Sequence, residues 1–239
     1  MKLMMKNLIL RTFLLCFLGS LGLVLLYAVI PVYLTPLMVF RSVSSWGAPE
    51  LVGIHHQWVS LEEISPHIQR AVVKAEDYRF YEHNGFDLDA IEKALEYNKT
   101  HKRKKGASTI SQQTAKNVFL WPHRDWIRKG LEAYFTVLIE LVWSKERIME
   151  VYLNVIEFGP GVYGVEAASQ KFFRRSAKKL NPSQASLLAA VLPNPRRWRV
   201  ERPSAYVLAR QRRILYRALP ATPAPRPLDV SRSWRTLFF

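Results

Sequence analysis

The sequence predicts an all-α, mainly helical globular domain behind one N-terminal transmembrane helix. Residues 14–40 contain no charged residue and are long enough to cross a bilayer of about 30 Å. After residue 64, apolar residues recur at helical spacing, and residues that favour helix N-caps stand before most of these stretches. A chain of 239 residues with 49% hydrophobic content can bury the core of one domain and carry an appendage.

The flanks of the apolar segment predict its orientation. Three basic residues precede it, Lys2, Lys6 and Arg11, and the first acidic residue of the chain is Glu50. The positive-inside rule therefore places residues 1–13 in the cytoplasm and everything after about residue 40 outside. A cleaved signal peptide is the alternative, but the run exceeds the usual apolar h-region of a signal peptide and lacks a clear cleavage pattern, which favours an uncleaved anchor. Pro31 and Pro36 are expected to end or kink the helix and leave residues 35–40 as an interfacial segment.

The net charge of +16 is unevenly distributed. Residues 41–173 carry 17 basic and 17 acidic residues, whereas residues 174–239 carry 15 basic and two acidic residues. In the cytosol such an excess indicates nucleic acid, but outside the membrane it favours anionic lipid headgroups and diphosphates, so no nucleic-acid partner is expected. A solvated basic surface is the plain alternative. The single cysteine, Cys16, lies in the apolar run and excludes an internal disulfide.

A short helix over residues 66–76 carries the first candidate for chemistry. Ser65 is a suitable N-cap, and Pro66 fits the first helical position. One face of the helix is apolar, with Ile68, Val72 and Ala75. Glu76 follows beside that face, so burial is expected to raise the pKa of its carboxyl above about 4.3 and make it a usable general base. An acidic pair with Asp77 on a solvated surface is the ordinary alternative.

Further helices are predicted over residues 88–98 and 126–143, from residues 110, 145 and 182, and over residues 205–219. The expected N-cap is Asp87 or Asp89 for the helix over residues 88–98 and Asp125 for the helix over residues 126–143. For the helices that begin at residues 110, 145 and 182, the expected N-caps are Thr109, Ser144 and Asn181. The core side of the helix over residues 126–143 is expected to hold Ile127, Leu131, Phe135, Leu138 and Val142. Residues 41–64 are interpreted as a linker with a short strand or hairpin, and residues 220–239 as a mobile tail that contains Pro and Arg.

Five segments, in order, resemble the signatures of the peptidoglycan glycosyltransferases, which polymerise lipid II. They are EDYRFYEHNGFD (76–87), GASTISQQTAKN (106–117), RKGLE (128–132), KERIMEVYLN (145–154) and GVYGVEAASQKFF (161–173). No transpeptidase domain follows, and VLPNP (191–195) also fits, so the resemblance is to the monofunctional biosynthetic transglycosylases. The chain departs at Gln184, where many members carry Glu, and at Met149, where Leu is common.

The resemblance implies a lysozyme-like glycosyltransferase domain of two lobes over residues 41–219, with a smaller jaw-like lobe near the bilayer. It also implies the reaction. The 4-hydroxyl of an acceptor sugar attacks the anomeric carbon of a lipid-linked donor, and undecaprenyl diphosphate leaves. An α-linked donor that gives a β-1,4-linked strand requires inversion in a single displacement.

The resemblance assigns residues to these steps. Glu76 is the expected base, and Lys116 with Arg128 is expected to hold the leaving diphosphate. For Glu132, the second expected catalytic residue, three roles stay open: orienting these cations, assisting the leaving group, or holding a divalent ion such as Mg or Mn. The donor side is expected to be lined by Ser108, Thr109, Gln113 and Asn117. Asp77, Phe80 and His83 are expected to support the base.

The expected partners are lipid II, the nascent glycan strand and membrane lipids, with other cell-wall synthases or division proteins as further candidates. The expected location is the bacterial inner membrane, with the catalytic domain in the periplasm. Two alternatives are open. The first is a cell-wall hydrolase or lytic transglycosylase on the same scaffold, which has no evident need for Lys116 and Arg128. The second is a non-enzymatic membrane-tethered scaffold, for which a degenerate site is expected.

Overall fold

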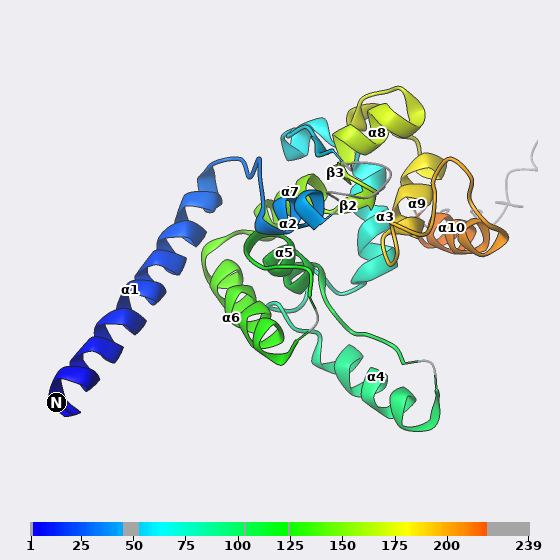
Figure 1. Cartoon of the computed structure of the whole chain (residues 1–239). Helices are drawn as coiled ribbons and strands as arrows, with labels where there is room; N and C mark the ends of the chain where they lie inside the picture. Colours follow the sequence, from blue (N-terminus) through cyan, green and yellow to red (C-terminus); the bar gives the residue numbers. More distant parts are fainter. Residues whose placement is uncertain (1, 45–52, 103, 124, 219–239) are drawn as a thin grey trace, which may run out of the picture.

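A computed structural model describes residues 2–44, 53–102, 104–123 and 125–218 (Figure 1). Within these ranges the chain forms ten α-helices, two short 3₁₀ helices and three very short strands. The predicted mainly helical fold is therefore confirmed. The expected tail over residues 220–239 lies outside the described residues, and so do residues 45–52 of the expected linker over residues 41–64.

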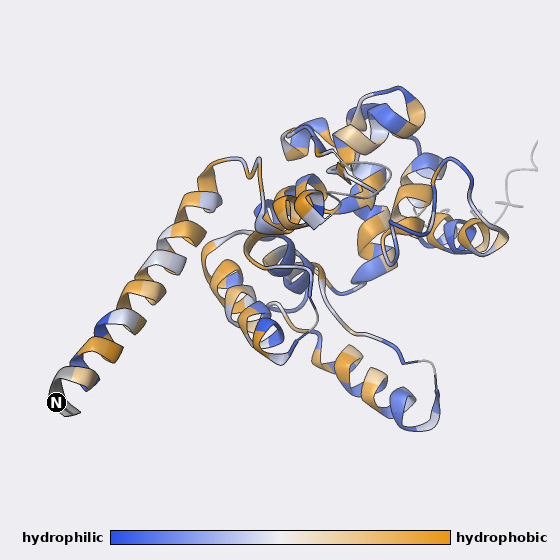
Figure 2. Ribbon diagram, in the orientation of Figure 1, coloured by the Kyte–Doolittle hydropathy of each residue, from blue (hydrophilic) through white to orange (hydrophobic). Residues whose placement is uncertain are grey.

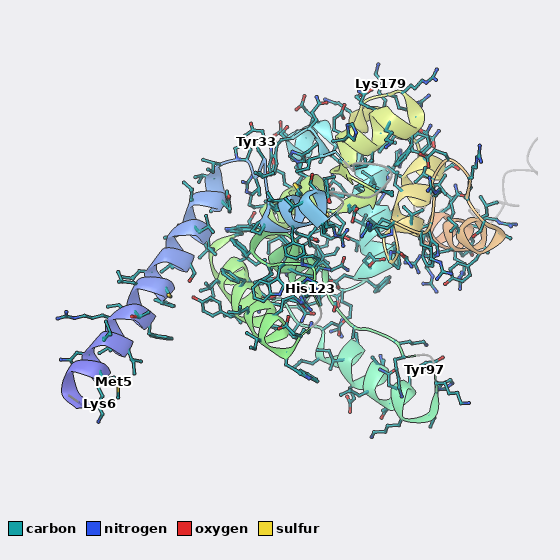
Figure 3. All side chains as sticks on the ribbon, viewed as in Figure 1. Met5, Lys6, Tyr33, Tyr97, His123 and Lys179 are labelled. Atoms are coloured by element: carbon teal, nitrogen blue, oxygen red, sulfur yellow. The ribbon has the colours of Figure 1, made fainter. Side chains whose placement is uncertain are left out.

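The N-terminal helix α1 (Lys2–Val29) extends away from the rest of the molecule (Figure 1). Its stretch Met5–Val29 is long and apolar enough to cross a membrane, and only 6% of its most apolar window is buried against the domain. Figure 2 shows this helix as mainly apolar, and Figure 3 shows its side chains projecting freely, for example around Met5. The helix ends before Pro31, and a separate helix, α2 (Pro36–Ser44), follows.

The C-terminal end of α1 is fastened to the domain by two side chains. Trp143 Nε1 donates to the Val24 carbonyl at 2.8 Å. The guanidinium of Arg147 donates to the Tyr27 carbonyl at 2.8 Å and also to the Ile30 carbonyl. The bonds from Arg147 satisfy carbonyl groups that the end of a helix leaves without an intrahelical partner. The anchor and the domain are thereby joined at defined atoms.

The domain has two lobes. One packs α3 (Pro66–Glu76) against α9 (Pro182–Val191) and α10 (Ala205–Ala218), with α8 (Val165–Phe173) nearby. The other packs α5 (Ile110–Phe119) against α6 (Trp126–Val142), and α7 (Lys145–Val155) joins the two through its contacts with α5 and α8. The remaining helix, α4 (Leu88–Thr100), projects from the second lobe (Figures 1 and 3). The two-lobed arrangement agrees with the expectation.

Most of the helix starts follow the predicted caps. Side-chain oxygens accept hydrogen bonds from backbone N–H groups at Ser65, Asp87, Thr109, Asp125, Ser144 and Asn181. Thr109 with Gln112, and Asn181 with Gln184, form complete capping boxes. The departure at Gln184 therefore keeps the capping interaction, because the side chain of Gln, like that of Glu, can accept from the N-cap backbone N–H.

A small sheet, not predicted in this form, joins the segment before α3 to the segment between α7 and α8. Its strands are β1 (His55–His56), β2 (Glu157–Gly159) and β3 (Val162–Tyr163), in the order β1-β3-β2. The pair β1 and β3 is parallel, and β2 and β3 are antiparallel. Gly164 follows with a φ of +81°, and a Cβ there would lie 2.6 Å from the Asn154 carbonyl oxygen. The backbone therefore approaches α7 closely at this position, which a residue with a side chain would prevent.

The expected core side of α6 is wrong at its first residue. Ile127 is 75% exposed, whereas Arg128 and Glu132 are 8% and 3% exposed. The inward face of the N-terminal half of this helix lines a polar cavity rather than the core, so its polar residues are buried and its apolar residues face outward. Leu141 on the same helix is 77% exposed, and none of the residues of α4 is buried. Apolar side chains therefore remain uncovered on the second lobe.

Candidate active site

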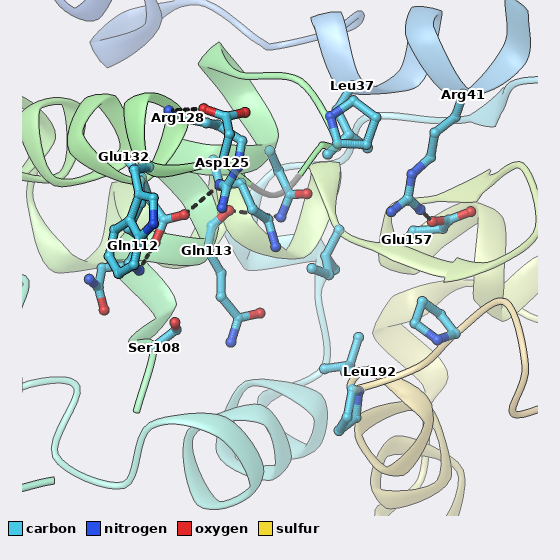
Figure 4. Close-up of a pocket in the computed structure, with 18 residues that line it drawn as sticks. Leu37, Arg41, Ser108, Gln112, Gln113, Asp125, Arg128, Glu132, Glu157 and Leu192 are labelled. Carbon is cyan, nitrogen blue, oxygen red and sulfur yellow. Dashed lines mark hydrogen bonds and ion pairs between the residues drawn. The ribbon is translucent and has the colours of Figure 1, made fainter. Parts of the chain in front are cut away.

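A cavity of about 620 Å³ lies between α5 and α6 on one side and α2, β2 and the segment after α9 on the other (Figure 4). Its charged lining residues come from four of these elements or their caps: Arg41, Lys116, Asp125, Arg128, Lys129, Glu132 and Glu157. Uncharged polar side chains from the start and face of α5 complete the wall: Ser108, Gln112, Gln113 and Asn117. The helix-capping structure at Thr109 fixes where this face begins.

Arg128 and Glu132 form a buried ion pair on α6. Arg128 Nη1 lies 2.8 Å from Glu132 Oε2, one helical turn away. Lys129 Nζ contacts the other oxygen of Glu132. Arg128 Nε is buried and has no hydrogen-bond partner among the described residues. A buried N–H without a partner is costly, so this group is suited to an anionic ligand in the cavity.

Lys116 adds a second cation from α5. Burial lowers the pKa of its ammonium, Glu132 opposes this effect, and Arg128, Arg41 and Lys129 add to it. No carboxylate of the described residues lies within 4.0 Å of Lys116 Nζ, so its charge is not consumed by an ion pair. The wall therefore concentrates positive charge around a polar space, which favours a multiply charged anion.

Glu76 lies at the last position of α3, next to this wall. Its Oε2 accepts from Gln113 Nε2 at 3.1 Å, and its Oε1 accepts from Arg210 Nη2 at 2.9 Å. Burial raises the pKa of the Glu76 carboxyl, while Gln113, Arg210 and Lys116 act in the opposite direction. Gln113 lines the cavity and bonds to Glu76, so it connects the carboxylate to the cationic wall. The Glu76 side chain is 12% exposed, which agrees with the partial burial expected from the apolar face of α3.

The residues after Glu76 fasten the end of α3 to the start of α5. Asp77 Oδ2 accepts from the Ile110 N–H at 2.9 Å, and its Oδ1 is bound to His83 Nε2 at 2.9 Å. Phe80 is fully buried beneath the ammonium of Lys145, 4.7 Å from the ring centroid. These three expected supporting residues thus lie together, and Asp77 contacts the backbone that begins the α5 wall.

Three of the expected donor-side residues make side-chain bonds within the protein: Gln113, which donates to Glu76, and also Thr109 and Asn117. The hydroxyl of Thr109 donates to the Gly85 carbonyl at 2.6 Å and accepts from the Gln112 N–H, and Thr109 lies outside the cavity lining. Asn117 lines the cavity, while its Nδ2 donates to the Gln113 carbonyl at 2.8 Å. Ser108 and Gln113 also line it. Of the four, Thr109 is therefore placed to hold α5 rather than to contact a ligand.

The arrangement around Glu132 does not fit a divalent ion as it stands. Both carboxylate oxygens are occupied, one by Arg128 and one by Lys129. Among the described residues, no group of three or more His, Cys, Asp or Glu side chains is placed to share a metal. A divalent ion at Glu132 would lie beside the positive charges of Arg128 and Lys129, which oppose its binding.

Several residues of the site were not predicted, and two of them are arginines, Arg41 and Arg210. Arg210 was expected to contact lipid headgroups with the other arginines of the last helix, but its guanidinium is turned to Glu76. Helical spacing contained the signal, because Arg210 is three residues after Val207 and four before Ile214, both buried. Arg41 likewise is four residues after the buried Leu37 and enters the cavity wall.

Comparisons with known proteins identify the family to which this chain belongs. A family model described as Transglycosylase matches residues 48–219. A biosynthetic peptidoglycan transglycosylase of Bdellovibrio bacteriovorus is 74% identical over 219 residues, which cover 92% of this chain and 88% of that protein. Proteins of the same name from Bacteroides thetaiotaomicron and Escherichia coli are 58% and 56% identical, over 80% and 81% of this chain and 77% and 81% of their own lengths. The chain belongs to the transglycosylase family.

Proposed function

We propose that this protein is a peptidoglycan glycosyltransferase that polymerises lipid II into β-1,4-linked glycan strands with inversion and releases undecaprenyl diphosphate. The observation that carries the proposal is one continuous polar structure: a largely buried carboxylate, Glu76, bonded through Gln113 to a cavity lined by Lys116 and Arg128. Transfer from a sugar diphosphate needs both parts, because the attacking hydroxyl must lose a proton and the leaving group carries negative charge.

Glu76 is assigned as the general base. Burial brings the pKa of its carboxyl toward neutrality, which strengthens it as a proton acceptor, and the hydrogen bond from Arg210 keeps the carboxylate available in its ionised form. The proton of the acceptor 4-hydroxyl passes to Glu76 as the oxygen attacks the anomeric carbon. Asp77, Phe80 and His83 hold the end of α3 in place for this step.

Lys116 and Arg128 are assigned to the diphosphate. The ammonium offers a compact charge, and the guanidinium offers a planar set of donors that matches phosphate oxygens. Arg128 Nε already lies buried without a partner among the described residues. Of the three roles considered for Glu132, its contacts favour orientation of the cations: it is paired with Arg128, as expected, and with Lys129 in place of Lys116.

The polar face of α5 is assigned to the donor sugar. Ser108, Gln113 and Asn117 line the cavity there, whereas Thr109 acts through the capping box that fixes the face. Inversion requires a single displacement, so Glu76 removes a proton and does not form a bond to the sugar. This role differs from that of the nucleophilic carboxylate in retaining glycosidases.

The helix α1 fits a single-pass membrane anchor. We assign it to the bacterial inner membrane, with residues 1–13 in the cytoplasm and the domain of residues 41–219 in the periplasm. Exposed apolar residues on α6 and α4, such as Leu141 at 77% exposed and Leu88 at 72%, suit contact with the bilayer beside the anchor. Membrane lipids, lipid II and the growing strand are the partners that this placement requires, and other cell-wall synthases or division proteins remain candidates.

A direct experiment separates this function from the hydrolase and scaffold alternatives. The full chain in detergent is incubated with labelled lipid II and, separately, with preformed uncrosslinked glycan strands, and the products are resolved on a glycan gel. The proposal predicts long strands from lipid II and no shortening of preformed strands. Shortened strands without polymerisation would establish a hydrolase or lytic enzyme, and no reaction of folded protein in either arm would support the scaffold.

A further inference from the structure

The helix α2 takes part in the cavity although it lies outside the matched family segment of residues 48–219. It packs against α5, with Leu37 and Met38 buried. Its start is fixed by Thr35, whose hydroxyl accepts from the Met38 N–H at 3.2 Å. Phe40 also meets His123, in the segment after α5, edge to face at 5.1 Å. This helix is therefore held firmly beside the wall that carries Lys116.

Arg41 extends from α2 into the cavity. Its guanidinium is ion-paired through Nη1 with Glu157 of β2, a residue whose side chain is 5% exposed. Figure 4 shows Arg41 and Glu157 at one side of the cavity, with Arg128 and Glu132 at the other. The charge of Arg41 also acts on Lys116, whose pKa it helps to lower. The cavity thus has cations from α2 as well as from α5 and α6.

The charges of the lining indicate what Arg41 adds. The wall contains four basic residues, Arg41, Lys116, Arg128 and Lys129, and three acidic residues, Asp125, Glu132 and Glu157. Without Arg41 the two signs balance, and the cavity has no net charge with which to attract an anion. A guanidinium has five N–H donors, so an ion pair through one nitrogen leaves others for a ligand.

We propose that Arg41 is a substrate-binding residue, the third cation of the diphosphate site, and that the juxtamembrane helix α2 is therefore part of that site. This inference rests on the proposed function. The ligand chemistry is a diphosphate attached to a polyprenyl chain, which is held at the membrane surface where α2 follows the anchor. Glu157 holds Arg41 in the cavity and shares it with the diphosphate when that group binds.

A double-mutant cycle distinguishes ligand binding from a purely structural ion pair. The variants are Arg41→Gln, Glu157→Gln and the two combined, with Arg70→Gln as a matched control on the exposed surface of α3. Each full-length variant is checked for an unchanged melting temperature. Two quantities are then measured: the Kd for farnesyl diphosphate, with farnesol as the uncharged control ligand, and the KM for lipid II.

The proposal predicts that Arg41→Gln raises both constants about tenfold, the effect of one hydrogen bond to a charged group. Glu157→Gln leaves them unchanged or lowers them, the combined variant stays as weak as Arg41→Gln, and Arg70→Gln matches the wild type. Recovery of wild-type affinity in the combined variant would overturn the proposal, because it would reduce Arg41 to a partner of Glu157. Unchanged constants in Arg41→Gln would overturn it as well.

The diphosphate is separated from lipid headgroups by repeating the KM measurement in nanodiscs. The loss in Arg41→Gln is expected in zwitterionic lipid alone and in lipid with an anionic component. A loss confined to anionic nanodiscs would assign Arg41 to headgroups and contradict the proposal. If wild-type protein polymerises lipid II and Arg41→Gln behaves like it, this inference fails alone; if wild type does not polymerise, the proposed function fails.

Discussion

The contact between Arg210 and Glu76 gives a prediction with a direction and a magnitude. Arg210 Nη2 lies 2.9 Å from Glu76 Oε1, and the two side chains are 21% and 12% exposed. Replacement by Gln in Arg210→Gln removes the positive charge and keeps a polar group of similar length. Because Arg210 favours the ionised carboxylate, its loss is expected to raise the pKa of Glu76 above the already raised value of the wild type.

The size of this shift follows from the geometry. Two unit charges about 4 Å apart interact by about 4 kcal/mol at an effective dielectric constant of 20. The cost of holding both groups away from water offsets much of this energy, and hydrogen bonds to charged groups contribute about 1.5–3 kcal/mol net. The lower end of this energy range corresponds to a shift of about one unit in the pKa of Glu76, since one unit equals about 1.36 kcal/mol.

The assay is the pH dependence of kcat/KM for polymerisation of lipid II. A general base must be ionised, so activity falls as the pH decreases through the pKa of Glu76. In Arg210→Gln the acid limb is expected to move upward by about one pH unit. Arg210→Lys should move it less, and Arg213→Gln, at an exposed position of the same helix, should leave it in place. An equal loss of activity at every pH, with an unmoved acid limb, would refute the reasoning.

Two further predictions concern the alkaline limb and the backbone. Burial lowers the pKa of Lys116 from 10.5, so activity should fall on the alkaline side below that pH as the ammonium loses its proton, and Lys116→Arg should flatten this limb in the same pH profile. Gly164→Ala should destabilise the fold by at least about 3 kcal/mol, because it combines a positive φ with a Cβ pressed on the Asn154 carbonyl. Gly130→Ala, which meets nothing within 4 Å in α6, should instead raise the melting temperature slightly.

Local interactions made the helices predictable. Caps such as Thr109 with Gln112 are set by residues three positions apart, so the sequence states them directly. The burial of Glu76 was also predictable, because the apolar face of α3 precedes it. The resemblance to a family then brought Lys116, Arg128 and Glu132 together with Glu76, and the structure places three of these residues on the cavity and the fourth beside it.

Contacts between distant segments were harder to predict. The strands of the sheet have two or three residues, too few for an alternating pattern, and they join segments about 100 residues apart. The outward position of Ile127 follows from the polar cavity beneath α6, which no local pattern announces. Arg210 sits on the buried face of its helix by spacing alone, but the carboxylate that it meets is 134 residues away. The basic composition of the last third of the chain predicted contact with lipid headgroups at the surface instead.

The most direct test of the central claim compares wild type with Glu76→Gln in one preparation. The rate of polymerisation of lipid II and the Kd for farnesyl diphosphate are measured on protein of equal melting temperature. The account predicts that Glu76→Gln loses about 100- to 10,000-fold in rate, the usual contribution of a general base, while the Kd is unchanged. Wild-type polymerisation by Glu76→Gln would contradict the account, since the acceptor hydroxyl would then lose its proton to another group.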